Sequence, residues 1–74
     1  MAKNLRMYHQ VIERDKGTKD WSTAFGSYKL AEVKAEVEYL RNDCDWREYD
    51  LISFPDVPNM IYAVMRVLNA EANK

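Results

Sequence analysis

The fold is decided by the stretch KLAEVKAEVEYLRN, residues 29–42. Apolar residues recur in it every three or four positions and charged residues fill the gaps, which is the pattern of an amphipathic helix. Ser27 is a candidate N-cap for this helix, and Glu32 lies where the helix dipole favours a negative charge. We therefore predict a helix over 29–42 whose apolar face consists of Leu30, Val33, Val37 and Leu40.

The chain before this helix has the pattern of a β-hairpin. Residues 5–13 fit a strand through alternation of their side chains and fit a helix through spacings of three and four. The run Asp15-Lys16-Gly17-Thr18 follows, and it is rich in residues that form turns. Large side chains then alternate over residues 21–25. The turn favours the first interpretation, so we predict strands over 5–13 and 21–25.

A third strand and a second helix are predicted after residue 42. Residues 47–54 form the strand, which Pro55 ends because proline cannot donate to a ladder. Pro58 suits the first turn of a helix that runs to about Ala72, with Asp56 as a candidate cap. Its apolar face consists of Ile61, Val64, Met65 and Leu68.

These elements predict one small α+β domain over residues 1–74, in the order β-β-α-β-α. A right-handed crossover through the first helix makes strand three parallel to strand two, so strand three lies antiparallel beside strand one. We expect a three-stranded antiparallel sheet of order 2-1-3. We also expect both helices on one face of it, which gives a two-layer sandwich.

Composition excludes several classes of protein. The 74 residues are 47% hydrophobic and 31% charged, as in a soluble globular chain. The pI of about 5.7 argues against nucleic acid as the partner, because phosphate binding needs a concentrated basic surface. The apolar run 60–65 is followed by Arg66 and falls far short of the roughly 20 residues that cross a bilayer. With a single cysteine and no leader pattern, we expect a cytoplasmic protein without a membrane span.

No catalytic or metal-binding pattern is complete in the sequence. The acidic stretch Asp43, Asp45, Glu48 and Asp50 lacks the glycine and the bidentate glutamate that a calcium loop needs. We interpret it as a solvated edge or a recognition surface. Cys44 and His9 are the only possible thiol–imidazole pair, but the flanking aspartates oppose formation of a thiolate. No glycine-rich phosphate loop is present. We predict no enzyme, no cofactor and no metal.

The aromatic and methionine content is the informative feature. Two Trp, five Tyr, two Phe and four Met are many large side chains for so small a core. Tyr8 and Ile12 point to one face of the predicted sheet and Met7 and Val11 to the other, so both faces are partly apolar. With both helices on one face, the other would leave Tyr8, Ile12 and some of the remaining aromatic residues in water. Such side chains are typical of interface cores, although they can also fold back to complete a thin core.

We therefore predict a non-enzymatic protein-interaction module that binds another protein or itself, as a homodimer. Its size and lack of catalytic groups are typical of phage or mobile-element accessory proteins, which modulate or inhibit a host protein. Stacking of single-stranded bases on the aromatic face is a weaker hypothesis. The predicted partner-binding residues are Tyr8, Ile12, Trp21, Phe25, Trp46, Tyr49, Asp43, Asp45, Glu48 and Asp50.

An alternative function is a homodimer that encloses a small anionic ligand such as a nucleotide. In that case Trp21, Tyr28 and Tyr49 would stack on the ligand. Arg6 or Arg47 would neutralise its charge.

Overall fold

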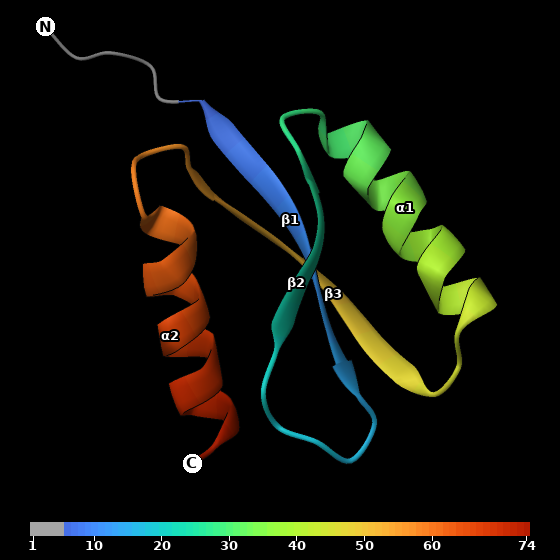
Figure 1. Ribbon diagram of the computed structural model, residues 1–74. Helices are drawn as coiled ribbons and strands as arrows, with labels where there is room; N and C mark the ends of the chain where they lie inside the picture. The colour runs from blue at the N-terminus through green and yellow to red at the C-terminus, as the bar shows by residue number, and fades with distance from the viewer. Residues whose placement is uncertain (1–5) are drawn as a thin grey trace, which may run out of the picture.

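The computed structural model describes residues 6–74 and confirms the predicted order of elements (Figure 1). The first predicted strand began at Leu5, which lies outside the described residues. The elements are β1 (Met7–Asp15), β2 (Ser22–Ser27), α1 (Leu30–Asp43), β3 (Arg47–Pro55) and α2 (Met60–Ala72).

The three strands form one antiparallel sheet in the predicted order β2-β1-β3. The β1–β3 pairing is regular from Met7 opposite Pro55 to Asp15 opposite Arg47. Between β1 and β2 the register shifts once, at a bulge between Gln10 and Ile12. Gly17 has a φ of 92° in the connecting turn, a conformation that glycine adopts without steric cost. The α+β class and the topology of the sheet are therefore as predicted.

The strand alternation gives the sheet two apolar faces. On one face Val11 and Tyr49 pack with Val33 and Val37 of α1, and together with Cys44 they form the buried core cluster. The opposite face carries Tyr8 and Phe54, which are directly paired across β1 and β3, together with Ile12. Each face therefore offers apolar surface to a helix.

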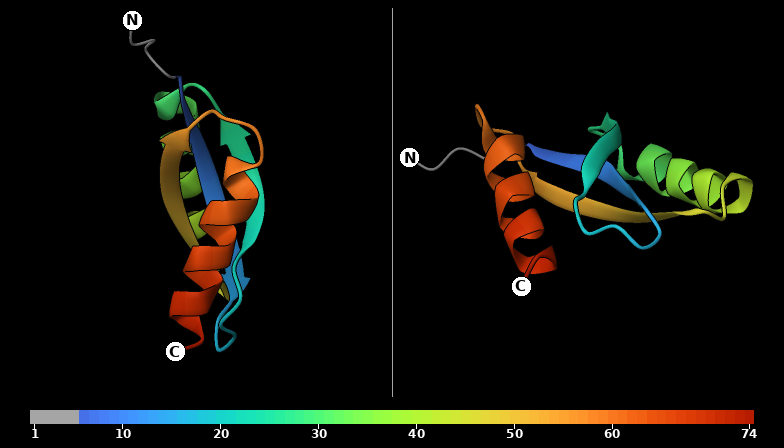
Figure 2. Two further views of the ribbon diagram at one scale, coloured as in Figure 1. Left: turned by 90° about the vertical axis from the view of Figure 1, so that its left-hand side faces the viewer. Right: turned by 60° about the horizontal axis from the view of Figure 1, so that its bottom comes forward.

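The two helices lie on opposite faces of the sheet, so the expectation that both cover one face was wrong (Figure 2). The handedness rule fixes α1, because α1 connects two parallel strands. No strand follows α2, so no crossover constrains it. With α1 already on the Val11 face, the free apolar surface around Tyr8 and Phe54 is the place where α2 can bury its own apolar residues.

The helix ends also differ from the predicted caps. The N-cap of α1 is Lys29; Ser27 Oγ instead accepts the Lys29 N–H at 3.1 Å and donates to the Glu32 carboxylate at 2.8 Å. The N-cap of α2 is Asn59, with a left-handed φ of 64°, and Pro58 precedes the helix rather than lying in its first turn. Asp56, the predicted cap, accepts a hydrogen bond from the Tyr28 hydroxyl.

Neither α1 nor α2 is long and apolar enough to cross a membrane; this finding covers residues 6–74.

Candidate functional site

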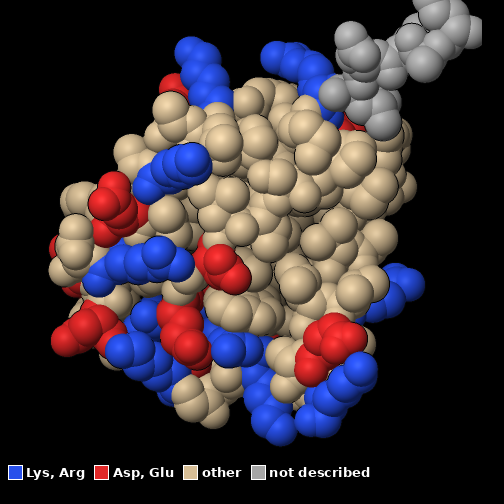
Figure 3. Space-filling model, turned by 180° about the vertical axis from the view of Figure 1, so that it is seen from behind, with Lys and Arg blue, Asp and Glu red and all other residues tan. Residues whose placement is uncertain are grey.

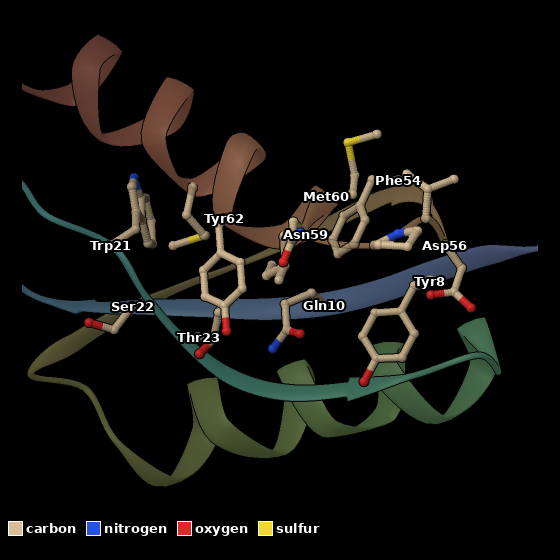
Figure 4. A pocket seen from close by; sticks show the side chains of 14 residues that line it. Tyr8, Gln10, Trp21, Ser22, Thr23, Phe54, Asp56, Asn59, Met60 and Tyr62 are labelled. Atoms are coloured by element: carbon tan, nitrogen blue, oxygen red, sulfur yellow. The ribbon is translucent and has the colours of Figure 1, made fainter.

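A groove of about 960 Å³ runs between α2 and the face of the sheet that α1 leaves free (Figure 4). Its lining is mainly aromatic and aliphatic, with a few polar groups from β1, β2 and the β3–α2 connection. This composition is typical of protein binding sites, where a few polar groups orient a mostly apolar contact. The principal apolar lining residues are Tyr8, Trp21, Phe54, Met60, Ile61 and Met65.

Aromatic rings of Tyr8 and its neighbours form one end of the groove. The Tyr8 ring meets Tyr28 edge to face, with centroids 5.0 Å apart, and lies 5.9 Å from Phe54. Gly26 makes this position possible, because a Cβ there would overlap the Tyr8 ring and lie 2.7 Å from Gln10 Oε1. A substitution at residue 26 would therefore displace Tyr8.

Gln10 is the one buried polar side chain recorded in the described core, and it stabilises the bulge beside the groove. Its amide nitrogen donates to the carbonyl oxygens of Val11 at 3.1 Å and Phe25 at 3.0 Å. These are carbonyls next to the register shift, where the extra residue of a bulge interrupts the regular ladder. Gln10 thus fixes the backbone on which the aromatic end of the groove rests.

The other end of the groove is closed by contacts between α2 and the β1–β2 loop. The Trp21 N–H donates to Asn69 Oδ1 at 2.6 Å, and Asn69 Nδ2 donates to the Trp21 carbonyl at 3.3 Å. Arg14 places its guanidinium 4.1 Å from the Trp21 ring centroid and pairs with Glu48 at 2.9 Å. These contacts hold the C-terminal half of α2 against the sheet.

A polar cluster flanks the aromatic end. The Tyr28 hydroxyl donates to Asp56 Oδ2 at 2.8 Å, and the Arg6 guanidinium lies 4.2 Å from the Tyr28 ring centroid. The hydrogen bond to Asp56 raises the pKa of Tyr28 above its ordinary value. Arg6 and Asp56 thus both contact Tyr28, so neither charge stands isolated beside the groove.

The helix α2 itself is incompletely covered. Its groove side is half-buried, and none of its side chains is fully buried. Tyr62, at the rim of the groove, is 70% exposed, and Val67, which does not line the groove, is 62% exposed. Seen from behind, a broad surface over β3 and α2 carries few charges, whereas charged side chains gather over α1 and along the lower edge (Figure 3).

Two of the predicted partner-binding residues, Tyr8 and Trp21, line the groove. Ile12 is only 1% exposed, so the expectation that it faces water was wrong; Tyr49, at 7%, is not among the aromatic residues left in water. Because α2 and α1 lie on opposite faces, each face has a helix over it, and Tyr49 belongs to the α1 side. The remaining aromatic residues, Phe25 and Trp46, are exposed but do not line the groove.

The four residues of the predicted acidic stretch have different surroundings and do not form one acidic surface. Glu48 is paired with Arg14, and Asp50 Oδ1 accepts the N–H of Leu51 at 2.8 Å. Asp43 and Asp45 are exposed at the end of α1 and in the following turn. In the described part of the chain, residues 6–74, no group of three or more acidic, His or Cys side chains could hold a metal ion.

The residues proposed for an anionic ligand are spread over the molecule. Trp21 and Tyr28 lie at opposite ends of the groove, and Tyr49 is buried under α1. Arg47 is bound to Glu13 at 3.1 Å and Asp15 at 3.0 Å, and these carboxylates, Glu13 first, raise its pKa. The structure does bring Arg6 over the Tyr28 ring, but this pair lies apart from Trp21 and Tyr49, so the three aromatic residues do not form one stacking site.

Cys44 and His9, the only possible thiol–imidazole pair in the sequence, each make other contacts. Cys44 is buried in the α1 core beside Tyr49. His9 is half-buried and faces its cross-strand neighbour, with Nδ1 2.6 Å from Ser53 Oγ. Neither His9 nor Ser53 lines the groove, so this pair has no adjoining binding cavity there.

Sequence reasoning missed Gln10, Arg14, Gly26 and Asn69. Gln10 and Asn69 share a signal, a polar side chain at a position where the period predicts an apolar one. Gly26 carries no such signal, because its role depends on the Tyr8 side chain of another strand. No protein-family model, no curated protein and no solved structure matches the chain.

Proposed function

We propose that this chain is a small non-enzymatic protein-interaction module that binds a partner protein through α2 and the groove beneath it. The observation that carries the proposal is the mismatch between the composition and the burial of α2. Its 13 residues include only two charged ones, Arg66 and Glu71, yet none of its side chains is fully buried. A helix that is apolar nearly all round is normally covered on all sides.

The groove adds a surface of the kind that protein interfaces use. Aromatic side chains and methionine are enriched at the centres of such interfaces, and charged residues are depleted there. Here Trp21, Tyr62 and Met65 line the groove, and Tyr62 stands at its rim because most of its surface is exposed. A partner that covers this rim would bury both the groove and the exposed turn of α2.

The partner class follows from the sequence. We propose that the bound protein is a host protein that the chain modulates or inhibits, as accessory proteins of phages and other mobile elements do. The small size of the chain and the absence of a catalytic motif in its sequence support this part of the proposal.

The test compares two exposed aromatic residues. Immobilised wild-type chain, Tyr62→Ser and the control Trp46→Ser are incubated with an extract of the source cells, and bound proteins are identified by mass spectrometry. We expect one protein to bind wild type and Trp46→Ser equally and Tyr62→Ser at least about tenfold less, the size of a hot-spot loss. Equal capture by all three chains, or no specific capture, would contradict the proposal. Equal thermal midpoints show that both variants are folded.

A thermal-shift screen addresses the anionic-ligand alternative. Because its residues lie apart and Arg47 is already paired, we expect nucleotides and other anions to leave the thermal midpoint unchanged. A large shift with one nucleotide would favour the ligand-binding dimer instead.

A further inference from the structure

The side of α2 that faces away from the sheet has the pattern of a two-helix seam. Positions that recur at alternating spacings of three and four define the a and d positions of a coiled coil. With Met60 and Val67 at a, the d positions are Ala63 and Ala70. Ala63, Val67 and Ala70 are exposed, whereas Ile61, Met65 and Leu68 are half-buried towards the sheet. Met60, at the start of the seam, is half-buried and also lines the groove, so the open part of the seam runs from Ala63 to Ala70. The helix thus has one apolar side for its own chain and another that its own chain leaves open.

The two charged residues of α2 flank this seam on opposite sides. Arg66 takes the g position and Glu71 the following e position, five residues later. In a parallel pair of helices, the g residue of one helix faces that e residue of the other. In an antiparallel pair, the g residue of one helix faces the g residue of the other, and the two e residues likewise face each other. Two copies of α2 in parallel would therefore form two Arg66–Glu71 ion pairs, while antiparallel copies would oppose like charges.

Both charges are available for such a contact. Among the ion pairs of residues 6–74, none involves Arg66, and Glu71 contacts only Lys74, in a pair whose side chains are 60% and 76% exposed. An ion pair so exposed contributes little to stability and is easily exchanged. No described element lies beyond α2 on the side away from the sheet (Figures 1 and 2). A second copy can therefore approach the seam.

We infer that the outward side of α2 binds a second copy of this chain, with the two helices parallel and in register. This inference rests on the proposed function, because it takes α2 as the interaction element; it leaves the groove free for the other partner. Two heptads are too few for an isolated coiled coil, since short helices are marginal in water. Here the contacts of Asn69 with Trp21 already hold each helix on its sheet, so dimerisation does not have to order it.

Charge reversal tests the inference with variants at exposed positions. Sedimentation equilibrium should give wild-type chain twice the monomer mass of 8.7 kDa. Arg66→Glu alone and Glu71→Arg alone each place like charges at both contacts, so each should weaken the dimer by about tenfold. An equimolar mixture of the two should recover the dimer, because both contacts then join opposite charges. Trp46→Ser should dimerise as wild type does.

Orientation has its own readout. Ala70→Cys places a thiol at a d position, where parallel in-register copies face each other, so mild oxidation should give a covalent dimer; Ala31→Cys on α1 is the exposed control. A monomeric wild type, or single variants that dimerise as tightly as wild type, would overturn the inference. So would a mixture that stays monomeric.

The two proposals can fail separately. A monomer whose Tyr62-dependent capture of another protein persists would leave the proposed function intact. A parallel dimer that captures nothing would contradict only that function.

Discussion

The helices α1 and α2 are nearly equal in length, 14 and 13 residues, but the sheet holds them in different ways. On its face, α1 buries Val33 and Val37, whereas α2 buries no side chain and is held at one end by the amide of Asn69. Full burial of an aliphatic side chain contributes about 1.5–3 kcal/mol. A hydrogen bond contributes about 1 kcal/mol net. The side chains of α1 therefore contribute more to the stability of the fold than those of α2 do.

The comparison also shows that apolar composition and burial are different properties. The less buried helix, α2, is the more apolar one, because it carries two charged residues where α1 alternates acidic and basic ones. A chain that needed α2 only for its own core would gain nothing from side chains as exposed as those of Tyr62 and Val67. Their exposure is the reason to assign α2 to binding and α1 to folding.

The variants with the largest expected difference in stability test the assignment of α1 to folding and α2 to binding. Val33 is completely buried, so Val33→Ala should lower the free energy of unfolding by about 2 kcal/mol through lost burial and a cavity. Met65→Ala on the half-buried side of α2 should cost less than about 1 kcal/mol, because part of that side chain already contacts water. Urea unfolding of both variants measures the difference. A Met65→Ala loss as large as that of Val33→Ala would mean that α2 belongs to the core.

An intermediate effect concerns the attachment of α2. Asn69→Ala removes both hydrogen bonds to the Trp21 backbone, so α2 should separate from the sheet more often. We expect amide hydrogen exchange over residues 60–72 to become about fivefold faster, because two partly exposed hydrogen bonds at about 0.5 kcal/mol each, the lower end of the usual range, make roughly 1 kcal/mol. Exchange in α1 should not change.

Asn73→Ala is the matched control, because it removes two exposed hydrogen bonds at the same end of the helix, to Asp20 and to the Asn69 carbonyl, and leaves the Asn69–Trp21 bonds in place. It should leave exchange in the first turns of α2 close to wild type. Faster exchange in α1 and α2 together after Asn69→Ala would show that the two helices unfold as one unit, contrary to the comparison.

The sequence predicted the α1 side better than the α2 side for a physical reason. The Val33–Val37 period and the strand alternation are local patterns, and the handedness of the crossover fixes where α1 goes. Nothing local fixes the face that α2 covers, because that depends on which apolar surface remains free after α1 has packed. The groove was missed for the same reason: Gly26, Gln10 and Asn69 act through residues far away in the sequence.

The smallest expected effect is a pH dependence of stability, which reports on the side of the sheet that α1 covers and shields from water. Tyr49 is buried under α1, and burial, together with the neighbouring Cys44 side chain, raises its pKa above the ordinary 10.0. The unfolded chain therefore loses this proton at a lower pH than the folded one. The contribution of Tyr49 to stability is complete below pH 10 and is lost as the pH rises through the folded pKa.

Unfolding free energies at about pH 8 and about pH 11 test this linkage, because they lie on either side of the ordinary tyrosine pKa. Tyr49→Phe removes the ionisable group, so its stability should fall less between the two values than that of wild type. Tyr39→Phe on the solvent side of α1, where the ring is 62% exposed, should behave as wild type does. The difference between the three chains is the measured quantity, because it isolates the contribution of residue 49. If Tyr49→Phe lost as much stability as wild type, water would reach Tyr49, and the α1 face would be no drier than the groove.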